Sequence, residues 1–157
     1  MGPSKGFILG LTAVIVLAGC GVRFFNAVSE GDAPAVLHGL EDGVSANLTI
    51  PIVGTTALMV AAGNGHLETV RILLDWGADP DATDLSGWTA LHAAAYRGDP
   101  AILRLLLARG AHIPAARWYL KTPRRWAEDA NSAEAAKVLE EAERGALRTE
   151  FGLSRTR

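Results

Sequence analysis

Small and apolar residues in the middle of the chain follow a pattern that repeats after 33 positions. Several short motifs recur at this offset: Thr56-Ala57-Leu58 as Thr89-Ala90-Leu91, Ala61-Ala62 as Ala94-Ala95, Leu73-Leu74 as Leu106-Leu107, and Gly77-Ala78 as Gly110-Ala111. Apolar residues within 67–74 and 100–107 have helical spacing. A threonine precedes each first helix as a cap, and Gly65 or Gly98 follows it, where positive φ suits glycine. The pattern predicts two helix–turn–helix units.

A weaker copy of this pattern lies on each side. Upstream, residues 22–47 match at an offset of 34, and the extra residue is expected in the apolar turn Ile50-Pro51-Ile52-Val53. Downstream, residues 121–142 keep Thr122-Pro123 but carry Arg124 and Arg125 at the positions of Leu91 and His92. A terminal unit needs polar residues on the face that no neighbour covers. We therefore expect these two units to cap the stack.

The 33-residue period and the run Gly87-Trp88-Thr89-Ala90-Leu91-His92-Ala93-Ala94 resemble the ankyrin repeat. The resemblance implies an all-α solenoid with β-turn fingers. It divides the ankyrin domain, residues 20–146, into four repeats at about 22–50, 51–83, 84–116 and 117–146, and leaves a C-terminal tail at 147–157. It also implies that His66 and His92 form structural hydrogen bonds between neighbouring turns. The family's usual binding surface is concave and consists of the finger tips and the first helices.

The N-terminal segment has a different pattern. An apolar stretch, Phe7 to Ala18, follows Lys5 and ends in small residues, which is the order of a secretory signal. A membrane-spanning anchor is the alternative, but the uncharged run from Phe7 to Val22 has 16 residues, against about 20 needed to span a bilayer. The run ends in Leu17-Ala18-Gly19-Cys20, which resembles the lipobox of bacterial lipoproteins.

The lipobox resemblance implies that residues 1–19 are a signal peptide and that Cys20 is lipidated after cleavage. Two or more acyl chains hold a protein stably on a membrane. The expected location is the bacterial cell envelope, facing the periplasm. The outer membrane is favoured because Gly21, and not Asp, follows the cysteine. A cytosolic or inner-membrane-anchored ankyrin adaptor is the alternative.

Composition and charge narrow the function further. The chain has 157 residues, a net charge of −2, one Cys and four His. A single Cys excludes an intramolecular disulfide framework. Asp79, Asp81 and Asp84 lack the spaced ligands and closing Glu of a calcium loop, and no serine lies in a Gly-x-Ser-x-Gly elbow. We expect no catalytic residue, metal site or cofactor. A periplasmic enzyme is the competing class.

Large residues outside the predicted core indicate where a partner binds. Trp, Tyr and Arg dominate the energetics of interfaces. The predicted partner-binding residues are Trp76, Leu85, Trp88, Tyr96, Arg97, Arg109, Trp118, Tyr119 and Lys121. By the repeat register, Trp126 is the one Trp or Tyr with a packing position. The alternative is that some of the other rings, Trp76 and Trp118 above all, lie on neighbouring fingers and stiffen the stack.

Charge is divided unevenly along the stack. Residues 20–90 contain two basic and nine acidic side chains, whereas residues 91–157 contain twelve basic and eight acidic ones. Cations alternate with aromatic rings between Arg117 and Trp126, a pattern also found in nucleic-acid-binding surfaces. In a secreted lipoprotein we favour an acidic protein partner or an anionic envelope surface over nucleic acid. A solvated, charged cap is the alternative.

These features together predict a monomeric, non-catalytic ankyrin module that binds a protein partner while lipid holds it at the envelope. Two cellular roles fit this prediction. The module could neutralise a toxin that arrives in the periplasm, or it could scaffold or protect an envelope enzyme.

Overall fold

The computed structural model describes residues 19–115 and 120–150, with side chains up to residue 146. Residues 19–30 are helical. Seven further helices follow in this part of the chain: α2 (Ala33–Glu41), α3 (Ala57–Asn64), α4 (Leu67–Asp75), α5 (Ala90–Arg97), α6 (Pro100–Ala108), α7 (Pro123–Asp129) and α8 (Ala133–Glu150). The described residues contain no strand, and one isolated antiparallel bridge joins Thr49 to Thr56. The prediction of an all-α solenoid is confirmed.

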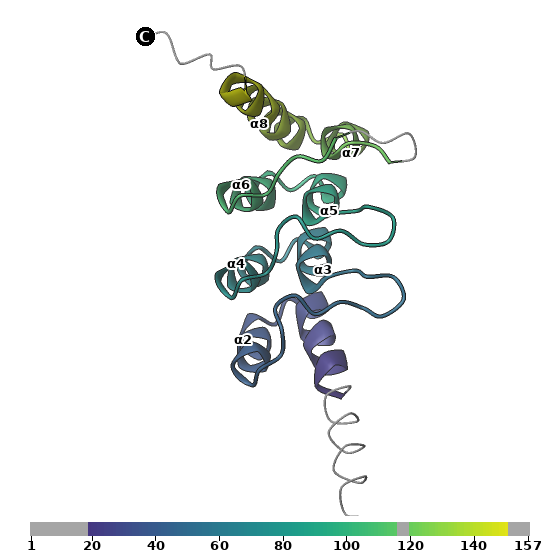
Figure 1. The fold of residues 1–157 in the computed structure, drawn as a ribbon, viewed down its shortest axis with the longest axis vertical. Coiled ribbons are helices and arrows are strands. Elements are labelled where there is room, and N and C mark those ends of the chain that lie inside the picture. The colour runs from purple at the N-terminus through teal and green to yellow at the C-terminus, as the bar shows by residue number, and fades with distance from the viewer. Residues whose placement is uncertain (1–18, 116–119, 151–157) are drawn as a thin grey trace, which may run out of the picture.

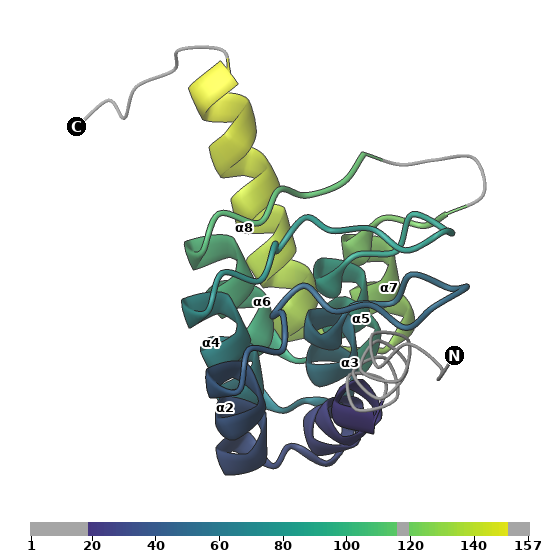
Figure 2. The same ribbon diagram turned by 60° about the horizontal axis from the view of Figure 1, so that its bottom comes forward.

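The helices form two stacked layers (Figure 1). The inner layer contains the helix at 19–30, α3, α5 and α7, and the outer layer contains α2, α4, α6 and α8. The fingers project from the inner layer in both ribbon views (Figures 1 and 2). Each repeat therefore contacts only its neighbours, as in other solenoids.

Local sequence explains where the inner helices begin and end. The Thr56 side chain accepts a hydrogen bond from the Met59 amide at 3.2 Å, and Thr89 accepts one from the His92 amide at 3.4 Å. These bonds satisfy amides that lack a partner in the first turn of each helix. Gly65 and Gly98 end α3 and α5 with φ of 82° and 76°, where glycine has no steric penalty.

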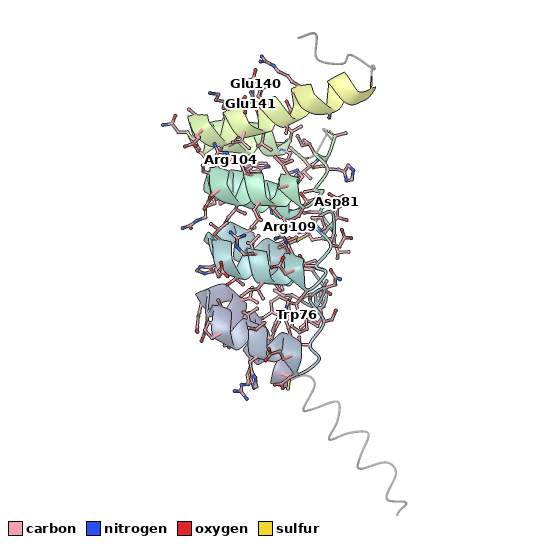
Figure 3. The ribbon with its side chains drawn as sticks, turned by 90° about the vertical axis from the view of Figure 1, so that its left-hand side faces the viewer. Trp76, Asp81, Arg104, Arg109, Glu140 and Glu141 are labelled. Carbon is pink, nitrogen blue, oxygen red and sulfur yellow. The ribbon has the colours of Figure 1, made fainter. Side chains whose placement is uncertain are left out.

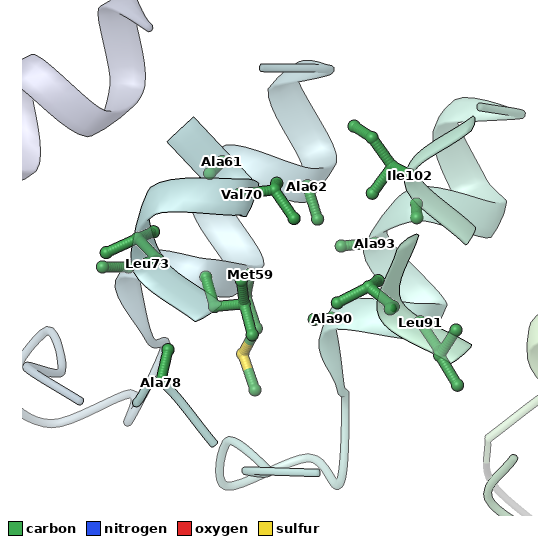
Figure 4. Packing of buried hydrophobic residues seen from close by; sticks show 14 of the residues in the cluster. Met59, Ala61, Ala62, Val70, Leu73, Ala78, Ala90, Leu91, Ala93 and Ile102 are labelled. Atoms are coloured by element: carbon green, nitrogen blue, oxygen red, sulfur yellow. The ribbon is translucent and has the colours of Figure 1, made fainter. Parts of the chain in front are cut away.

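Small residues let the inner helices approach closely, and large ones fill the space between the layers. Ala61, Ala62, Ala90 and Ala93 lie in the core between neighbouring units (Figure 4). The largest fully buried aliphatic side chains are Leu58, Leu73, Leu91, Ile102, Leu103, Leu106 and Leu139. The core is therefore continuous along the stack, because each repeat buries its apolar face on the next.

The structure differs from the expected boundaries at both ends. The first helix already includes Gly19 and Cys20, before the expected start of the first repeat at 22. At the other end, α8 continues to Glu150, four residues into the segment 147–157 expected as a tail. Within the described ranges, no helix is both long enough and apolar enough to span a bilayer.

Candidate partner-binding surface

Three aromatic side chains share one face of the inner layer at α5. Trp88 directly precedes the cap residue Thr89, whereas His92 and Tyr96 lie four residues apart on one face of α5. The rings of Trp88 and His92 are stacked, with centroids 5.2 Å apart and planes at 26°. Tyr96 meets Trp88 edge to face, with centroids 6.4 Å apart. The loop before α5 therefore brings the Trp88 ring against His92 and Tyr96, and the three rings form a column.

The next repeat adds a fourth ring to this column. Trp126 of α7 meets Trp88 at 5.3 Å and Tyr96 at 5.5 Å, both in edge-to-face geometry. Aromatic pairs with this geometry contribute about 0.5–1.5 kcal/mol beyond the area that they bury. The Lys121 ammonium lies 5.0 Å from the centroid of the Trp126 ring and donates to Asp129 Oδ2 at 2.6 Å. We call Trp88, Tyr96, Trp126 and Lys121 the aromatic surface.

His92 supports this surface from beneath. The Thr89 amide donates to His92 Nδ1 at 3.2 Å, so the proton of the neutral ring is on Nε2, 3.1 Å from the Lys121 carbonyl oxygen. Burial lowers the pKa of His92, and the Lys121 carbonyl and the Asp84 charge oppose that shift only in part. His92 is thus a neutral link between the third and fourth repeats.

Both predicted structural histidines join neighbouring repeats. Besides the bond from His92, His66 Nε2 lies 2.9 Å from the Ser29 carbonyl oxygen of the first repeat. The predicted structural role of His66 and His92 is confirmed. Each ring thus helps to hold one repeat to the next.

The rings of the aromatic surface differ in exposure. Tyr96 is 61% exposed, whereas Trp88 and Trp126 are partly buried and pack against the hydrophobic core. The expectation that Trp88 has no packing role is therefore wrong. Trp88 is partly buried because the Trp126 ring of the next repeat covers it. The Trp126 Nε1 donor is buried and has no hydrogen-bond acceptor within the described part of the chain.

Arg97 follows Tyr96 and is the last residue of α5. It is exposed, but its guanidinium packs over Gly65 of the preceding repeat, in the space that a Cβ at Gly65 would occupy. Gly65 is thus constrained twice, by its φ of 82° and by Arg97. None of the ion pairs among the described residues involves Arg97. Its charge remains available to a carboxylate of a partner.

The other predicted residues are not gathered at this surface. Trp76 and Arg109 follow the outer helices α4 and α6 (Figure 3). Trp76 is 46% exposed, and Arg109 forms a 2.6 Å ion pair with Asp75 of the preceding repeat. Leu85 is 83% exposed at the tip of the second finger. Trp118 and Tyr119 lie outside the described residues.

Ion pairs offset the positive charge of the last repeat. Lys121 pairs with Asp129, Arg124 with Glu128 and Glu143, and Arg125 with Glu128. All of these pairs are at least partly exposed, so each adds little to stability. They still lower the net field of this end, which weakens the interpretation of Lys121, Arg124 and Arg125 as an anion-binding cluster. Among the described side chains, no three His, Cys, Asp or Glu are grouped as metal ligands.

Two features of the surface were not predicted. The repeat register correctly predicts a packing role for Trp126, but it does not predict that the ring covers Trp88; it aligns Trp126 with Ala93, a small residue of α5. A Trp at that position could have indicated a ring that reaches across to Trp88. No contact role was predicted for the apolar turn Ile50-Pro51-Ile52-Val53 of the first finger, and its lack of charged side chains was the available signal.

The layered helix pairs, the fingers and the aromatic inner face define a helical-repeat protein of the protein-binding class. A family model of ankyrin repeats matches residues 24–117 as three copies, and the chain belongs to this family. The fourth helix pair, α7 and α8, lies beyond that match. Family and fold give the chain a protein-binding role.

The curated relatives match this chain over similar stretches, but these stretches are very different fractions of the relatives' own lengths. Protein phosphatase 1 regulatory subunit 27 of Homo sapiens is 37% identical over 90 residues, which are 57% of this chain and 58% of that protein. The Mus musculus protein of the same name is 37% identical over 95 residues, or 60% of this chain and 62% of the relative. The inactive serine/threonine-protein kinase TEX14 of Mus musculus is 36% identical over 87 residues, which are 55% of this chain and 6% of that protein. The matched region thus spans about three fifths of the phosphatase regulatory subunits.

Proposed function

We propose that this chain is a non-catalytic module that binds a protein partner on the aromatic surface while lipid on Cys20 holds it at the periplasmic side of a bacterial envelope. The observation that carries the proposal is the 61% exposed Tyr96, supported from behind by Trp88 and Trp126. A rigid, exposed ring on a packed base loses little conformational entropy when a partner covers it.

The chemistry of the surface specifies the partner. The rings offer apolar contact area, and the exposed Arg97, which follows Tyr96 in the chain, offers a charge-assisted, bidentate hydrogen bond to a carboxylate. The favoured partner is therefore a protein segment with an apolar or aromatic residue next to Asp or Glu. The similarity to phosphatase regulatory subunits covers part of each chain and supports a binding module. The chemistry of the partner is inferred from the aromatic surface and Arg97 alone.

The anchoring part of the proposal rests on the lipobox resemblance and on the position of Cys20. Cys20 is a free, exposed cysteine at the start of the described chain. Its side chain is accessible for acylation without disturbing the core. A module held there would meet partners that enter or reside in the periplasm, either a toxin that it neutralises or an enzyme that it scaffolds or protects.

The binding test is capture from envelope extract with the full chain, followed by titration of the captured protein. Tyr96→Ala and Arg97→Ala should each weaken binding by about 2 kcal/mol, or roughly 30-fold, as residues at the centre of an interface do. The matched control is Trp76→Ala, which removes an exposed ring from the outer layer and should leave the affinity unchanged.

Melting curves are measured in parallel, because loss of fold would imitate loss of binding. Tyr96→Ala should melt close to wild type, since its ring is mostly exposed. If Tyr96→Ala binds as tightly as wild type and Trp76→Ala does not, the partner uses the outer layer and the proposed surface is incorrect. The identity of the captured protein, a toxin or a resident enzyme, decides between the two cellular roles.

A further inference from the structure

The tips of the first two fingers expose aliphatic side chains to solvent. Ile52 is 92% exposed, Leu85 83%, Val53 48% and Ile50 37%. These four are half of the eight large hydrophobic residues that are exposed in the described chain. They lie on adjacent loops that project from the inner layer (Figure 1). We call Ile50, Ile52, Val53 and Leu85 the finger-tip patch.

The patch is held together by backbone hydrogen bonds. The Leu85 amide donates to the Val53 carbonyl at 3.2 Å, which joins the two tips. Within the first finger, the Ile50 amide donates to the Thr55 carbonyl at 2.8 Å and the Gly54 amide to the Ile50 carbonyl at 3.0 Å. Ile52 has φ of 78°, which is unfavourable for a β-branched residue. The loop thus holds a strained backbone and presents an apolar side chain to the outside.

The two finger segments themselves carry almost no charge. Residues 49–56 contain no ionisable side chain, and residues 83–88 contain only Asp84. One oxygen of Asp84 accepts hydrogen bonds from the Ser86 amide at 2.8 Å and the Trp88 amide at 3.0 Å. Amides of its own loop already donate hydrogen bonds to this carboxylate. An apolar environment over the patch would therefore leave few polar groups without a hydrogen-bond partner.

The start of the described chain lies at the base of the same finger. A Cβ at Gly21 would contact Leu48 Cδ2 at 3.6 Å, and Leu48 directly precedes the first finger. Cys20 and Leu48 also line one cavity of about 400 Å³ between the first helix and α2. The residue that carries the proposed anchor is therefore close to the first finger. A bilayer that holds lipid on Cys20 would therefore lie close to the finger-tip patch.

We propose that the finger-tip patch inserts into the interface of the lipid bilayer to which the chain is anchored. This inference rests on the proposed anchoring at Cys20. Ile52 and Leu85 enter the boundary between headgroups and acyl chains, as the apolar side chains of interfacial proteins do. The patch carries no Lys or Arg, and residues 20–90 have an excess of acidic side chains. The contact is therefore apolar, needs no anionic lipid, and on a neutral bilayer is insensitive to salt.

The test uses the full chain purified from membranes and reconstituted into phosphatidylcholine vesicles. Leu85→Cys carries an NBD fluorophore, and Leu37→Cys on α2 is the matched control, since Leu37 is an exposed leucine on the outer layer. Flotation with the vesicles reports the anchor. NBD emission and its quenching by lipids with a shallow nitroxide report the patch. Wild type is treated with the same thiol reagent, and absence of labelling shows that Cys20 already carries lipid.

We expect both labelled proteins to float, with a blue shift and strong quenching at position 85 and aqueous emission at position 37. Added Ile52→Asp should abolish the quenching at position 85, and added Asp79→Asn should preserve it. High salt should change neither signal. Protein that fails to float overturns both the anchor and the patch. Protein that floats with aqueous emission at position 85 overturns the patch alone and points to a protein groove as its occupant. Quenching that salt removes also overturns apolar insertion.

Discussion

His92 joins the third repeat to the fourth through one side chain. It lies beneath Trp88, accepts a hydrogen bond from the Thr89 amide and donates one to the Lys121 carbonyl. The bond from the Thr89 amide requires an unprotonated Nδ1, so the neutral ring carries its proton on Nε2. Protonation would place a donor at Nδ1 opposite another donor and would bury a charge. The pH dependence of stability should therefore report this residue.

We expect acid to weaken the fold through His92. Its folded pKa is below the unfolded value of about 6.5, so the unfolded state binds a proton that the folded state lacks. The stabilisation is complete above about pH 6.5 and is lost as the pH falls from there through the folded pKa. Urea unfolding of wild type and His92→Asn at pH 7.5 and 5.5 measures it. Wild type should lose more stability than the variant, and equal losses would contradict the prediction.

Gly65 and Gly63 allow a matched pair of substitutions in α3. Gly65→Ala places a methyl group at φ of 82° and against Arg97, so it should destabilise the fold by about 1–2 kcal/mol or more. Gly63 lies inside α3, and a Cβ there would meet Ala93 at an ordinary 3.7 Å. Gly63→Ala should stabilise the fold by about 0.5–1 kcal/mol. Thermal melts of the two variants should shift in opposite directions, and a common direction would contradict the assigned helix end.

Among the elements, α5 and α6 form the central repeat, and their contacts decide how the stack unfolds. Leu106 of α6 is completely buried, whereas Leu105 next to it is only partly so. The repeat register of the sequence correctly assigned Leu106 to the core. It did not correctly assign Trp88, because the ring that covers Trp88 belongs to the next repeat, 38 residues further along (126 minus 88).

Leu106→Ala should cost about 2–5 kcal/mol, since it removes a buried side chain and leaves a cavity. In a short solenoid this loss reaches the neighbouring repeat through the shared interface. The third and fourth repeats should then lose protection against hydrogen exchange before the first two. Leu105→Ala is the control and should cost less. A Leu106→Ala melt that coincides with wild type would mean that the register of α6 is incorrect.

For the whole molecule, the proposed anchoring would decide which surfaces meet a partner. Lipid on Cys20 would hold the stack near the bilayer, because the helix at 19–30 already includes the cysteine. The aromatic surface lies in the third and fourth repeats, away from this end of the stack (Figure 1). The two proposed contacts use different residues, although Leu85 of the finger-tip patch and Trp88 of the aromatic surface belong to the same repeat.

Cys20→Ser should abolish labelling by a palmitate analogue and leave an unprocessed precursor, because the thiol is the proposed acyl acceptor. Ser45→Ala is the control, since it changes an exposed hydroxyl near the same end without affecting the lipobox. Labelling is followed by gel fluorescence, and processing by the mass of the purified protein. Equal labelling of Cys20→Ser and wild type would disprove lipidation at this residue.

The sequence by itself determined the repeat, its period and the residues that cap and end the inner helices. This was possible because each helix pair depends on residues close together in the chain, such as Thr89 with His92 and Gly65 with the end of α3. Tertiary structure alone decided that Trp126 covers Trp88, that Arg97 lies over Gly65, and that Leu85 bonds to Val53. These contacts join residues some 30 or more positions apart on different repeats. They depend on how closely the repeats stack and which way each side chain turns, and a repeating pattern specifies neither.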